Sequence, residues 1–304
     1  MSKTDACQDT TCVDYYKAEF DSAARAVVLK RRLKTSKDDK DLAMTKESKI
    51  GIALGGGSIL GAAHIGVLKA FEAENIAFTA ISGTSIGALV SALYAFGVSV
   101  DDIEEIAVDL DWLDISGFAF SRFGLLSNEK MGKMIKDVLG DVQFRDAHIP
   151  LSVVATDVGR FEKVILDSGD VAPAVMASTC LPGIFIPVEI DDRTLVDGGL
   201  MENVPISPLI ALNMDAVIGV DLNAGRKFKK PGDLIDVLIN AIDIAIDNAT
   251  RIQTQKADLI IAPALSAYNR TDRELVRDLI REGEEAARRI IAETAWLGTL
   301  RSTR

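Results

Sequence analysis

Histidine, cysteine and basic residues are all scarce in this chain, and each shortage excludes a class of protein. The 304 residues include two histidines and three cysteines, and the only closely spaced cysteines are Cys7 and Cys12, so a zinc site or another metal site built on these residues is not expected. Lysine and arginine number 34 against 45 acidic residues, for a formal net charge of -11. Because phosphate backbones are held mainly by lysine and arginine, a nucleic-acid partner is not expected either. The same deficit argues against a mainly electrostatic hold on anionic lipid.

Long apolar runs are missing as well. No segment reaches the ~18 to 20 continuous apolar residues of a membrane span. The N-terminal stretch MSKTDACQDTTC has no apolar signal-peptide core. We therefore expect a cytoplasmic protein, either free or in peripheral contact with a membrane. A hydrophobic content of 48% is sufficient for a large core.

The first 48 residues differ in character from the rest. Residues 1–12 are polar, and Val13 to Leu33 has helix-forming composition with basic residues near its C-terminal end. The charged run Lys34 to Lys49 is typical of a linker. The helix is expected to pack on the domain or on another copy of the chain, with an interfacial membrane helix as the alternative. The predicted organisation is a tail, helix and linker over residues 1–48 and one folded domain over residues 49–304.

From residue 50 onward, short apolar runs alternate with helical stretches. The expected strands are Ile50 to Leu54, Ala80 to Ser82, Leu151 to Ala155, Ala216 to Val220 and Leu259 to Ala262. The expected helices are Ala62 to Ala73, Ala88 to Phe96, Met131 to Leu139, Val171 to Ser178, Leu234 to Asp247 and Arg273 to Ala295. Short apolar runs are typical of strands covered on both faces. The pattern predicts an α/β fold, a three-layer α/β/α sandwich with a mostly parallel central sheet and active residues at the carboxyl ends of its strands.

The pentapeptide GTSIG, from Gly83 to Gly87, directly follows one of these strands. A G-x-S-x-G sequence places a serine on a tight turn between a strand and a helix, where the glycines remove Cβ clashes. Ser85 is therefore a candidate nucleophile. An α/β-hydrolase triad needs the chain order serine, acid, histidine, and this order is impossible here because both histidines precede Asp197.

The base for Ser85 must therefore be another group, and a carboxylate is the only common one left. Asp157, in ATDVG, follows an expected strand but is better explained as an Asx-type turn before Gly159. Asp197, in the sequence DGG, fits either a base or an Asp-Gly turn. The residues alone leave the choice of carboxylate open.

A glycine-rich loop, Gly55-Gly56-Gly57-Ser58, joins the first strand to a helix. Consecutive backbone N–H groups in such a loop can converge on one negative oxygen, as a tetrahedral ester intermediate requires. The spacing fits neither a dinucleotide loop, which needs G-x-G-x-x-G, nor a Walker loop, which needs GK[ST].

The two histidines are interpreted as structural residues. His64 lies among small apolar neighbours in AAHIGVL and is expected to be a hydrogen-bonded packing residue. His148 precedes a strand and is expected in a loop at the far end of the sheet.

Four blocks of the sequence together resemble the patatin-like phospholipases. They are LGGGSILGAAHIGVL (Leu54 to Leu68), GTSIGAL (Gly83 to Leu89), the stretch from Ser168 to Pro182, and DGGLMENVPISPL (Asp197 to Leu209). Four blocks in the same order and spacing are far more specific than G-x-S-x-G alone. The resemblance, over residues 49 to 290, implies a patatin-like catalytic domain with a dyad of Ser85 and Asp197.

The chain departs from the family pattern within the glycine loop. Ser58 stands in place of the middle glycine, and Leu60 stands in place of a basic residue. A positive φ at Ser58 would strain any residue other than glycine.

The predicted function is that of a serine acyl-ester hydrolase, a lipase, phospholipase or esterase, that works through an acyl-enzyme. The amides of Gly56, Gly57 and Ser58 are expected to hold the oxyanion. A lipid or a small ester is the expected substrate, and no metal or organic cofactor is implied. The alternative is a catalytically impaired family member that binds lipid or a partner protein. The aromatic segment Asp111 to Leu126 is expected to form either a flap over an acyl-binding cleft or part of the core.

Overall fold

The computed structural model describes Thr45 and residues 48–109, 117–121, 124–226, 230–268 and 275–300. The helix expected at Val13 to Leu33 and its charged linker lie outside these residues, apart from Thr45, Ser48 and Lys49. Part of the aromatic segment also lies outside them. Within the described residues, no helix combines the length and the apolarity needed to cross a bilayer.

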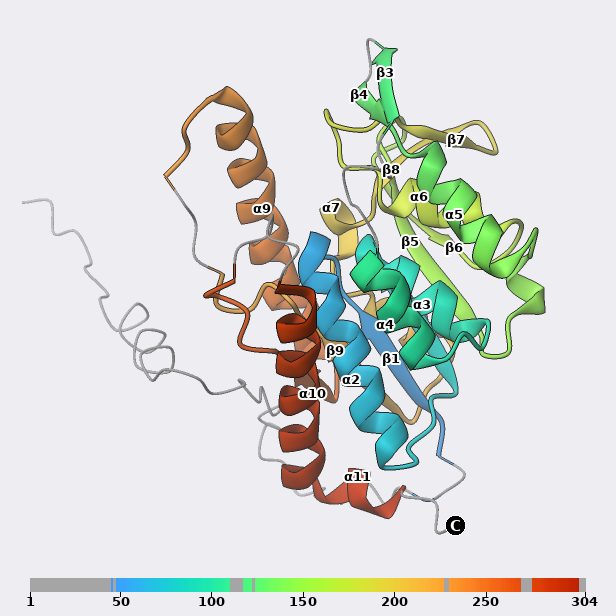
Figure 1. The fold of residues 1–304 in the computed structure, drawn as a ribbon, viewed down its shortest axis with the longest axis vertical. Helices are drawn as coiled ribbons and strands as arrows, with labels where there is room; N and C mark the ends of the chain where they lie inside the picture. Colours follow the sequence, from blue (N-terminus) through green and yellow to red (C-terminus); the bar gives the residue numbers. More distant parts are fainter. Residues whose placement is uncertain are drawn as a thin grey trace, which may run out of the picture.

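A single large sheet forms the centre of the described domain (Figure 1). Its strands are β1 (Ile50–Leu54), β2 (Ala80–Thr84), β5 (Leu151–Asp157), β6 (Glu162–Leu166), β7 (Val188–Ile190), β8 (Arg193–Asp197), β9 (Ala216–Val220) and β10 (Leu259–Ile261). The strand order is β10-β9-β1-β2-β5-β8-β7, with β6 paired to β5. The run from β10 to β5 is parallel, and β6 and β8 are antiparallel to β5. The predicted mostly parallel sheet is confirmed, and every strand expected from an apolar run is present.

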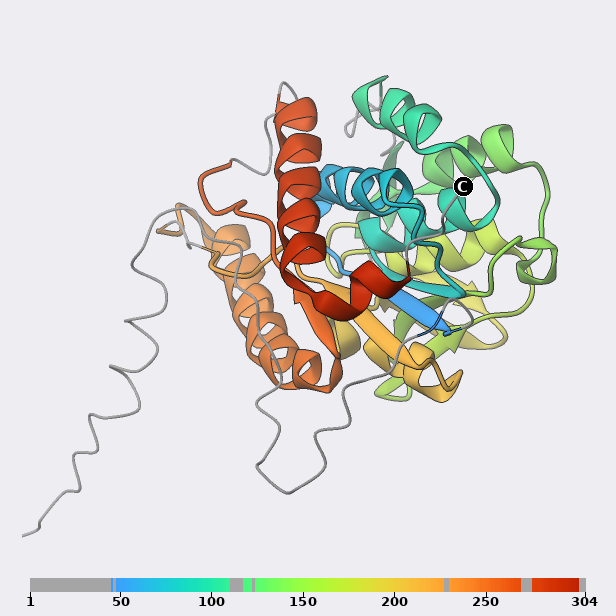
Figure 2. The ribbon, with the colours of Figure 1, turned by 90° about the horizontal axis from the view of Figure 1, so that it is seen from below.

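Helices cover both faces of this sheet, as Figures 1 and 2 show together. They are α2 (Ala62–Ala73), α3 (Ile86–Ala95), α4 (Val100–Asp109), α5 (Glu129–Leu139), α6 (Val171–Ser178), α7 (Gly199–Glu202), α8 (Ile206–Ala211), α9 (Leu234–Gln253), α10 (Val276–Glu293) and α11 (Ala295–Thr299), with 3-10 turns η1 (Ser58–Gly61), η2 (Phe144–Asp146) and η3 (Thr254–Lys256). Strand β1 contributes side chains to the cores on both faces of the sheet. Ile52 and Leu54 join the core that includes α2, α3 and α10, whereas Ala53 joins the core beneath α8. The predicted three-layer α/β/α sandwich is confirmed.

The segment expected as a flap contains a hairpin of β3 (Gly117–Ser121) and β4 (Gly124–Ser127), which projects from one end of the domain in Figure 1. Its base is joined to the loop after α6, because Leu126 donates to the Ile184 carbonyl and accepts from the Ile186 amide, both at 2.9 Å. The apolar-run analysis missed this hairpin together with the short strands β6, β7 and β8.

Helices α2 and α10 approach so closely that glycine is required on both sides. A Cβ atom at Gly66 would lie 1.8 Å from the Ile280 carbonyl oxygen, and one at Gly283 would lie 1.9 Å from the Ala63 carbonyl oxygen. Both distances are far below van der Waals contact. The α10 helix is therefore fixed against the helix that begins at the glycine loop.

Replacing Gly283 by Ala should lower the free energy of unfolding by about 1–3 kcal/mol or more, because the added methyl group forces the two helices apart. Gly298→Ala is the matched control, since no atom lies within 4 Å of the added Cβ. This control should be neutral or up to about 1 kcal/mol more stable, as expected from the helix preference of alanine. Urea unfolding followed by circular dichroism measures both, and equal stability of the two variants would contradict the packing argument.

Candidate active site

Ser85 lies on a strained turn between β2 and α3. Its backbone has φ 55° and ψ -127°, a conformation that side-chain-bearing residues rarely adopt. The turn is tight because a Cβ at Gly87 would lie 2.1 Å from the Leu54 carbonyl oxygen. The Ser85 amide donates to Ser178 Oγ at 2.8 Å, and Ser178 Oγ donates to the Val154 carbonyl at 2.6 Å. Neighbouring elements therefore hold the strained turn in place.

Strand β5 brings Asp197 to this turn. Thr84, the residue before Ser85, is in register with Val154 of β5, and Asp197 is in register with the next residue, Ala155. Because β6 occupies the other edge of β5, β2 and β8 lie end to end along the same edge. The Asp197 carbonyl also accepts from Thr156 Oγ1 at 2.9 Å.

The carboxyl group of Asp197 lies in a buried, polar position. Burial raises its pKa to about 6, and the nearby Asp243 carboxylate raises it as well. Hydrogen bonding from the Ser85 side chain and from the Gly199 amide, which donates to Oδ1 at 2.7 Å, acts in the opposite direction. The carboxylate is therefore mostly ionised at neutral pH, yet it is a stronger base than an ordinary aspartate.

The orientation of each peptide in the glycine loop is fixed through its carbonyl group. The Gly55 carbonyl accepts from His64 Nε2 at 2.7 Å, and the Gly56 carbonyl accepts from Asn223 Nδ2 at 3.0 Å. The Gly57 carbonyl accepts from the Leu60 amide at 3.2 Å. In a trans peptide the N–H group points opposite to the C=O group, so each of these bonds also sets the direction of the next amide.

The Gly56 amide does not fit the oxyanion role expected for it. It donates to the Asn203 carbonyl at 3.1 Å, so in this conformation it is already engaged. Gly57 and Ser58 both line the cavity in front of Ser85, and in the described part of the chain neither amide is bonded to an acceptor. The loop therefore presents two candidate oxyanion donors rather than three.

Ser58 adopts the backbone conformation that a glycine would favour. Its φ is 56°, in the left-handed region, which costs a residue with a side chain roughly 1–2 kcal/mol. The side chain is exposed. A serine in place of the family's glycine therefore adds strain to the loop.

The two histidines have the structural roles expected for them. His64 is fully buried, and burial lowers its pKa to about 4, so the ring is neutral and donates through Nε2 to the loop. His148 lies just before β5, where its amide donates to the Ala95 carbonyl at 2.9 Å. Asp157 forms the expected Asx turn, accepting at Oδ1 from the amides of Gly159 at 2.9 Å and Arg160 at 3.0 Å.

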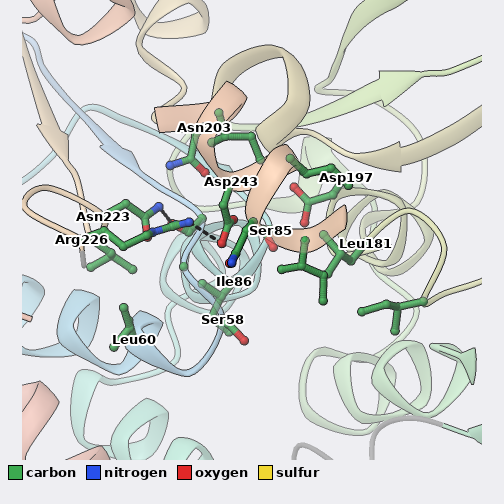
Figure 3. Close-up of a pocket in the computed structure, with 18 of the residues that line it drawn as sticks. Ser58, Leu60, Ser85, Ile86, Leu181, Asp197, Asn203, Asn223, Arg226 and Asp243 are labelled. Atoms are coloured by element: carbon green, nitrogen blue, oxygen red, sulfur yellow. Dashed lines mark hydrogen bonds and ion pairs between the residues drawn. The ribbon is translucent and has the colours of Figure 1, made fainter. Parts of the chain in front are cut away.

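A cavity of about 770 Å³ opens in front of Ser85 and Asp197, and Figure 3 shows residues from its walls. One side is formed by Leu181, Ile184 and Phe185 of the loop after α6. The opposite side is formed by the inner surface of α9 and by the segments that follow β9 and β10. Further wall residues there are Leu222, Asn223, Arg226, Lys230, Ile239, Asn240, Ile242, Asp243, Ile246, Leu265 and Tyr268.

Several polar wall residues were missed by the sequence analysis. Asn223 follows the carboxyl end of β9, a position that strand-end reasoning could have identified. Asn203 lies within the block that begins at Asp197. Arg226 and Asp243 form an ion pair at 2.5 Å, drawn as a dashed line in Figure 3; nothing in their sequence spacing marks it.

Comparisons with known proteins identify the family. The model of the family described as patatin-like phospholipase matches residues 52–210, which include the glycine loop, Ser85 and Asp197. The chain belongs to this family.

Two curated relatives are similar to this chain over part of its length. An uncharacterized NTE family protein of Mycobacterium tuberculosis is 34% identical over 181 residues, which are 59% of this chain and 50% of that protein. A lysophospholipase of Emericella nidulans is 28% identical over 189 residues, which are 58% of this chain and 12% of that protein. The chain thus spans at most about half the length of either relative.

The crystal structure of VipD from Legionella pneumophila superposes with a TM-score of 0.57 at 14% identity. It covers 81% of this chain and 67% of VipD. At this level of identity the similarity shows the patatin-like fold alone.

Loss of the Asn223 side chain, which holds the Gly56 carbonyl, should weaken the candidate site without unfolding the protein. Asn223→Ala frees the Gly56 carbonyl and lets the next peptide rotate, so we expect ester hydrolysis to fall about 10- to 100-fold, less than the effect of deleting the strongest oxyanion donors. Hydrolysis by the Asn223→Asp variant should fall similarly, because a carboxylate oxygen cannot donate a hydrogen bond to the Gly56 carbonyl. The exposed Asn213→Gly serves as control, because glycine accepts the positive φ of 54° at that position. Unchanged kcat in a folded Asn223→Ala protein would show that the loop holds its orientation without this bond.

Proposed function

We propose that this protein hydrolyses the acyl ester bond of a lipid through Ser85 and Asp197. The observation that supports this most strongly is the register along β5, which leaves the strained serine turn and the buried carboxylate at adjacent positions of one strand edge. Both residues line the same cavity, with the glycine loop beside them. Membership of a phospholipase family supports a hydrolase acting on lipid esters.

In the proposed reaction, Asp197 accepts the proton of the Ser85 hydroxyl while Oγ attacks the ester carbonyl carbon. The carbonyl oxygen becomes an oxyanion, and the Gly57 and Ser58 amides donate hydrogen bonds to it. Collapse of this intermediate breaks the bond to the alcohol, which leaves with the proton held by Asp197. A water molecule then attacks the acyl-enzyme and gives a proton to Asp197. The bond between the acyl carbon and Ser85 Oγ breaks, Oγ takes the proton back from Asp197, and the fatty acid is released.

The cavity suits an elongated amphiphile. Its size lies within the usual range of roughly 300–1,000 Å³ for small-molecule sites. The loop after α6 contributes mainly aliphatic and aromatic side chains, whereas the side toward α9 combines aliphatic residues with polar and charged groups, including Lys230 and Asn240. The name of the Emericella nidulans relative, a lysophospholipase, points to esters with one acyl chain. We infer that the acyl chain lies against the apolar side and the head group toward α9.

The alternative, a catalytically impaired protein that binds lipid, rests on Ser58 and Leu60. Two observations favour the active protein. Ser58 lines the cavity and, within the described residues, its amide is not bonded to an acceptor, even though its φ of 56° strains the loop. The side chain of Leu60 is buried and makes an apolar contribution to the cavity wall.

Ser85→Ala and Asp197→Asn should each remove nearly all hydrolysis of a chromogenic short-chain ester, because one variant lacks the nucleophile and the other lacks the base. The double variant His64→Gln and His148→Gln should keep activity within about tenfold, since a glutamine amide in place of the His64 ring can still donate to the Gly55 carbonyl and neither histidine reaches the proposed chemistry. Circular dichroism establishes that each variant is folded. Loss of activity in the folded histidine variant, comparable to the Ser85→Ala loss, would replace the dyad with a histidine mechanism.

The pH dependence of hydrolysis should report Asp197. The carboxylate must be ionised to accept a proton, so kcat/KM should rise with pH and level off above the pKa of about 6. Asp243→Asn should shift the rising limb to lower pH, because the Asp243 carboxylate raises the pKa of Asp197. Asp236→Asn is the matched control: it lies on the same helix and cavity wall, and it is not among the groups that shift Asp197. An identical shift in both variants would mean that the limb does not arise from Asp197.

A further inference from the structure

Helix α9 turns two carboxylates inward and exposes several of its large aliphatic residues. Its carboxylates Asp243 and Asp247 turn inward, where they pair with the nearly buried Arg226 at 2.5 and 3.6 Å. Five of its large aliphatic residues turn outward and are 48% to 73% exposed: Leu234, Val237, Leu238, Ile244 and Ile252. A surface helix normally places its apolar stripe inward and its charges outward.

These aliphatic residues form one continuous stripe. Together with the exposed Ala241, Ala245 and Asn248 they recur every three or four positions, the spacing of one side of an α-helix. We call this set of eight residues the outer face of α9. It contains no charged side chain and runs along a helix of 20 residues, which is about 30 Å long.

The outer face lies next to the cavity of the proposed active site. The adjacent side of the same helix lines that cavity through Ile239, Ile242 and Ile246. Along α9 from Leu234 to Ala245, every residue whose side chain is described is exposed or half-buried. Figure 1 shows this end of α9 standing away from the rest of the domain.

We propose that the outer face of α9 docks on a neutral, zwitterionic lipid surface and holds the cavity mouth against it. The proposal rests on the proposed function, because a lipid substrate must pass from an aggregate into the cavity. An uncharged apolar stripe with its polar side turned away is the pattern of a helix that lies in a lipid interface. The net charge of -11 opposes anionic lipid, so neutral lipid is the surface that fits this protein.

A second copy of the chain fits the outer face less well. A stable protein interface takes about 20–30 residues from each partner. The outer face offers eight, in a row one or two side chains wide. A lipid surface requires no complementary shape, and a narrow stripe is sufficient to bind it.

The test compares the double variant Leu234→Gln and Leu238→Gln with a control of equal chemistry elsewhere, Val138→Gln and Phe161→Gln, two exposed apolar residues on other elements. Both are made in the full chain with Ser85→Ala, so that no lipid is hydrolysed during binding. Co-sedimentation with phosphatidylcholine vesicles measures partition. The outer-face variant should bind at least about tenfold more weakly than the Ser85→Ala parent, and the control should bind like the parent.

Soluble-ester hydrolysis by the same pairs with Ser85 intact separates the two proposals. It should be equal in both pairs; absence of hydrolysis in every protein would overturn the proposed function while leaving the binding result valid. Equal vesicle binding by the two variants, no binding by the parent, or preference for phosphatidylserine vesicles would overturn the docking proposal. The docking proposal would also be overturned if sedimentation equilibrium showed a dimeric parent and a monomeric outer-face variant while vesicle binding stayed unchanged. The partner of the outer face would then be a second copy of the chain.

Discussion

The proposed active site of this protein depends on hydrogen bonding along one edge of β5. Strand β2 occupies that edge as far as Val154, and β8, running in the opposite direction, takes it over at Ala155. The end of each strand therefore meets the end of the other, and the residues placed there are Ser85 and Asp197. Two side chains more than a hundred positions apart in the sequence are aligned by backbone pairing, which is rigid because β6 holds the other edge of β5.

A second constraint orients the glycine loop. A peptide can rotate by half a turn at little cost when neither of its polar groups is bound, and a rotated amide cannot donate into the cavity. Here the carbonyls of Gly55 and Gly56 are held by the side chains of His64 and Asn223. His64, one of two histidines in the chain, therefore has a structural role. Burial keeps its ring neutral, so it donates from Nε2 without placing a charge beside the proposed oxyanion site. The loop resembles a preformed donor array more than a flexible lid.

The sequence predicted the parallel half of the sheet and Ser85 from local signals alone, because continuous apolar runs and a G-x-S-x-G turn are local features. It did not predict β8, whose five residues include Arg193, Thr194 and Asp197 and show no apolar run. The choice of Asp197 consequently came from resemblance to a family. Asn223 was missed because its partner, Gly56, is 167 residues away and a single asparagine carries no pattern. The sequence also did not predict which side of α9 faces the protein, because periodicity locates an apolar stripe but does not say whether the protein or its surroundings cover it.

Charge pairing and apolar exposure compete in α9, and their magnitudes are similar. Leaving Arg226 without its carboxylates would cost about 3–5 kcal/mol, the usual penalty for breaking a buried ion pair. Leaving five large aliphatic side chains about half exposed forgoes roughly 4–8 kcal/mol of burial. The ion pairs therefore explain why the carboxylates face inward, but they do not outweigh the apolar exposure by themselves. The free energy of this helix is most favourable when its inner side keeps the ion pairs with Arg226 and its outer face has an apolar partner. A lipid surface meets that requirement without altering the cavity wall that the same helix provides.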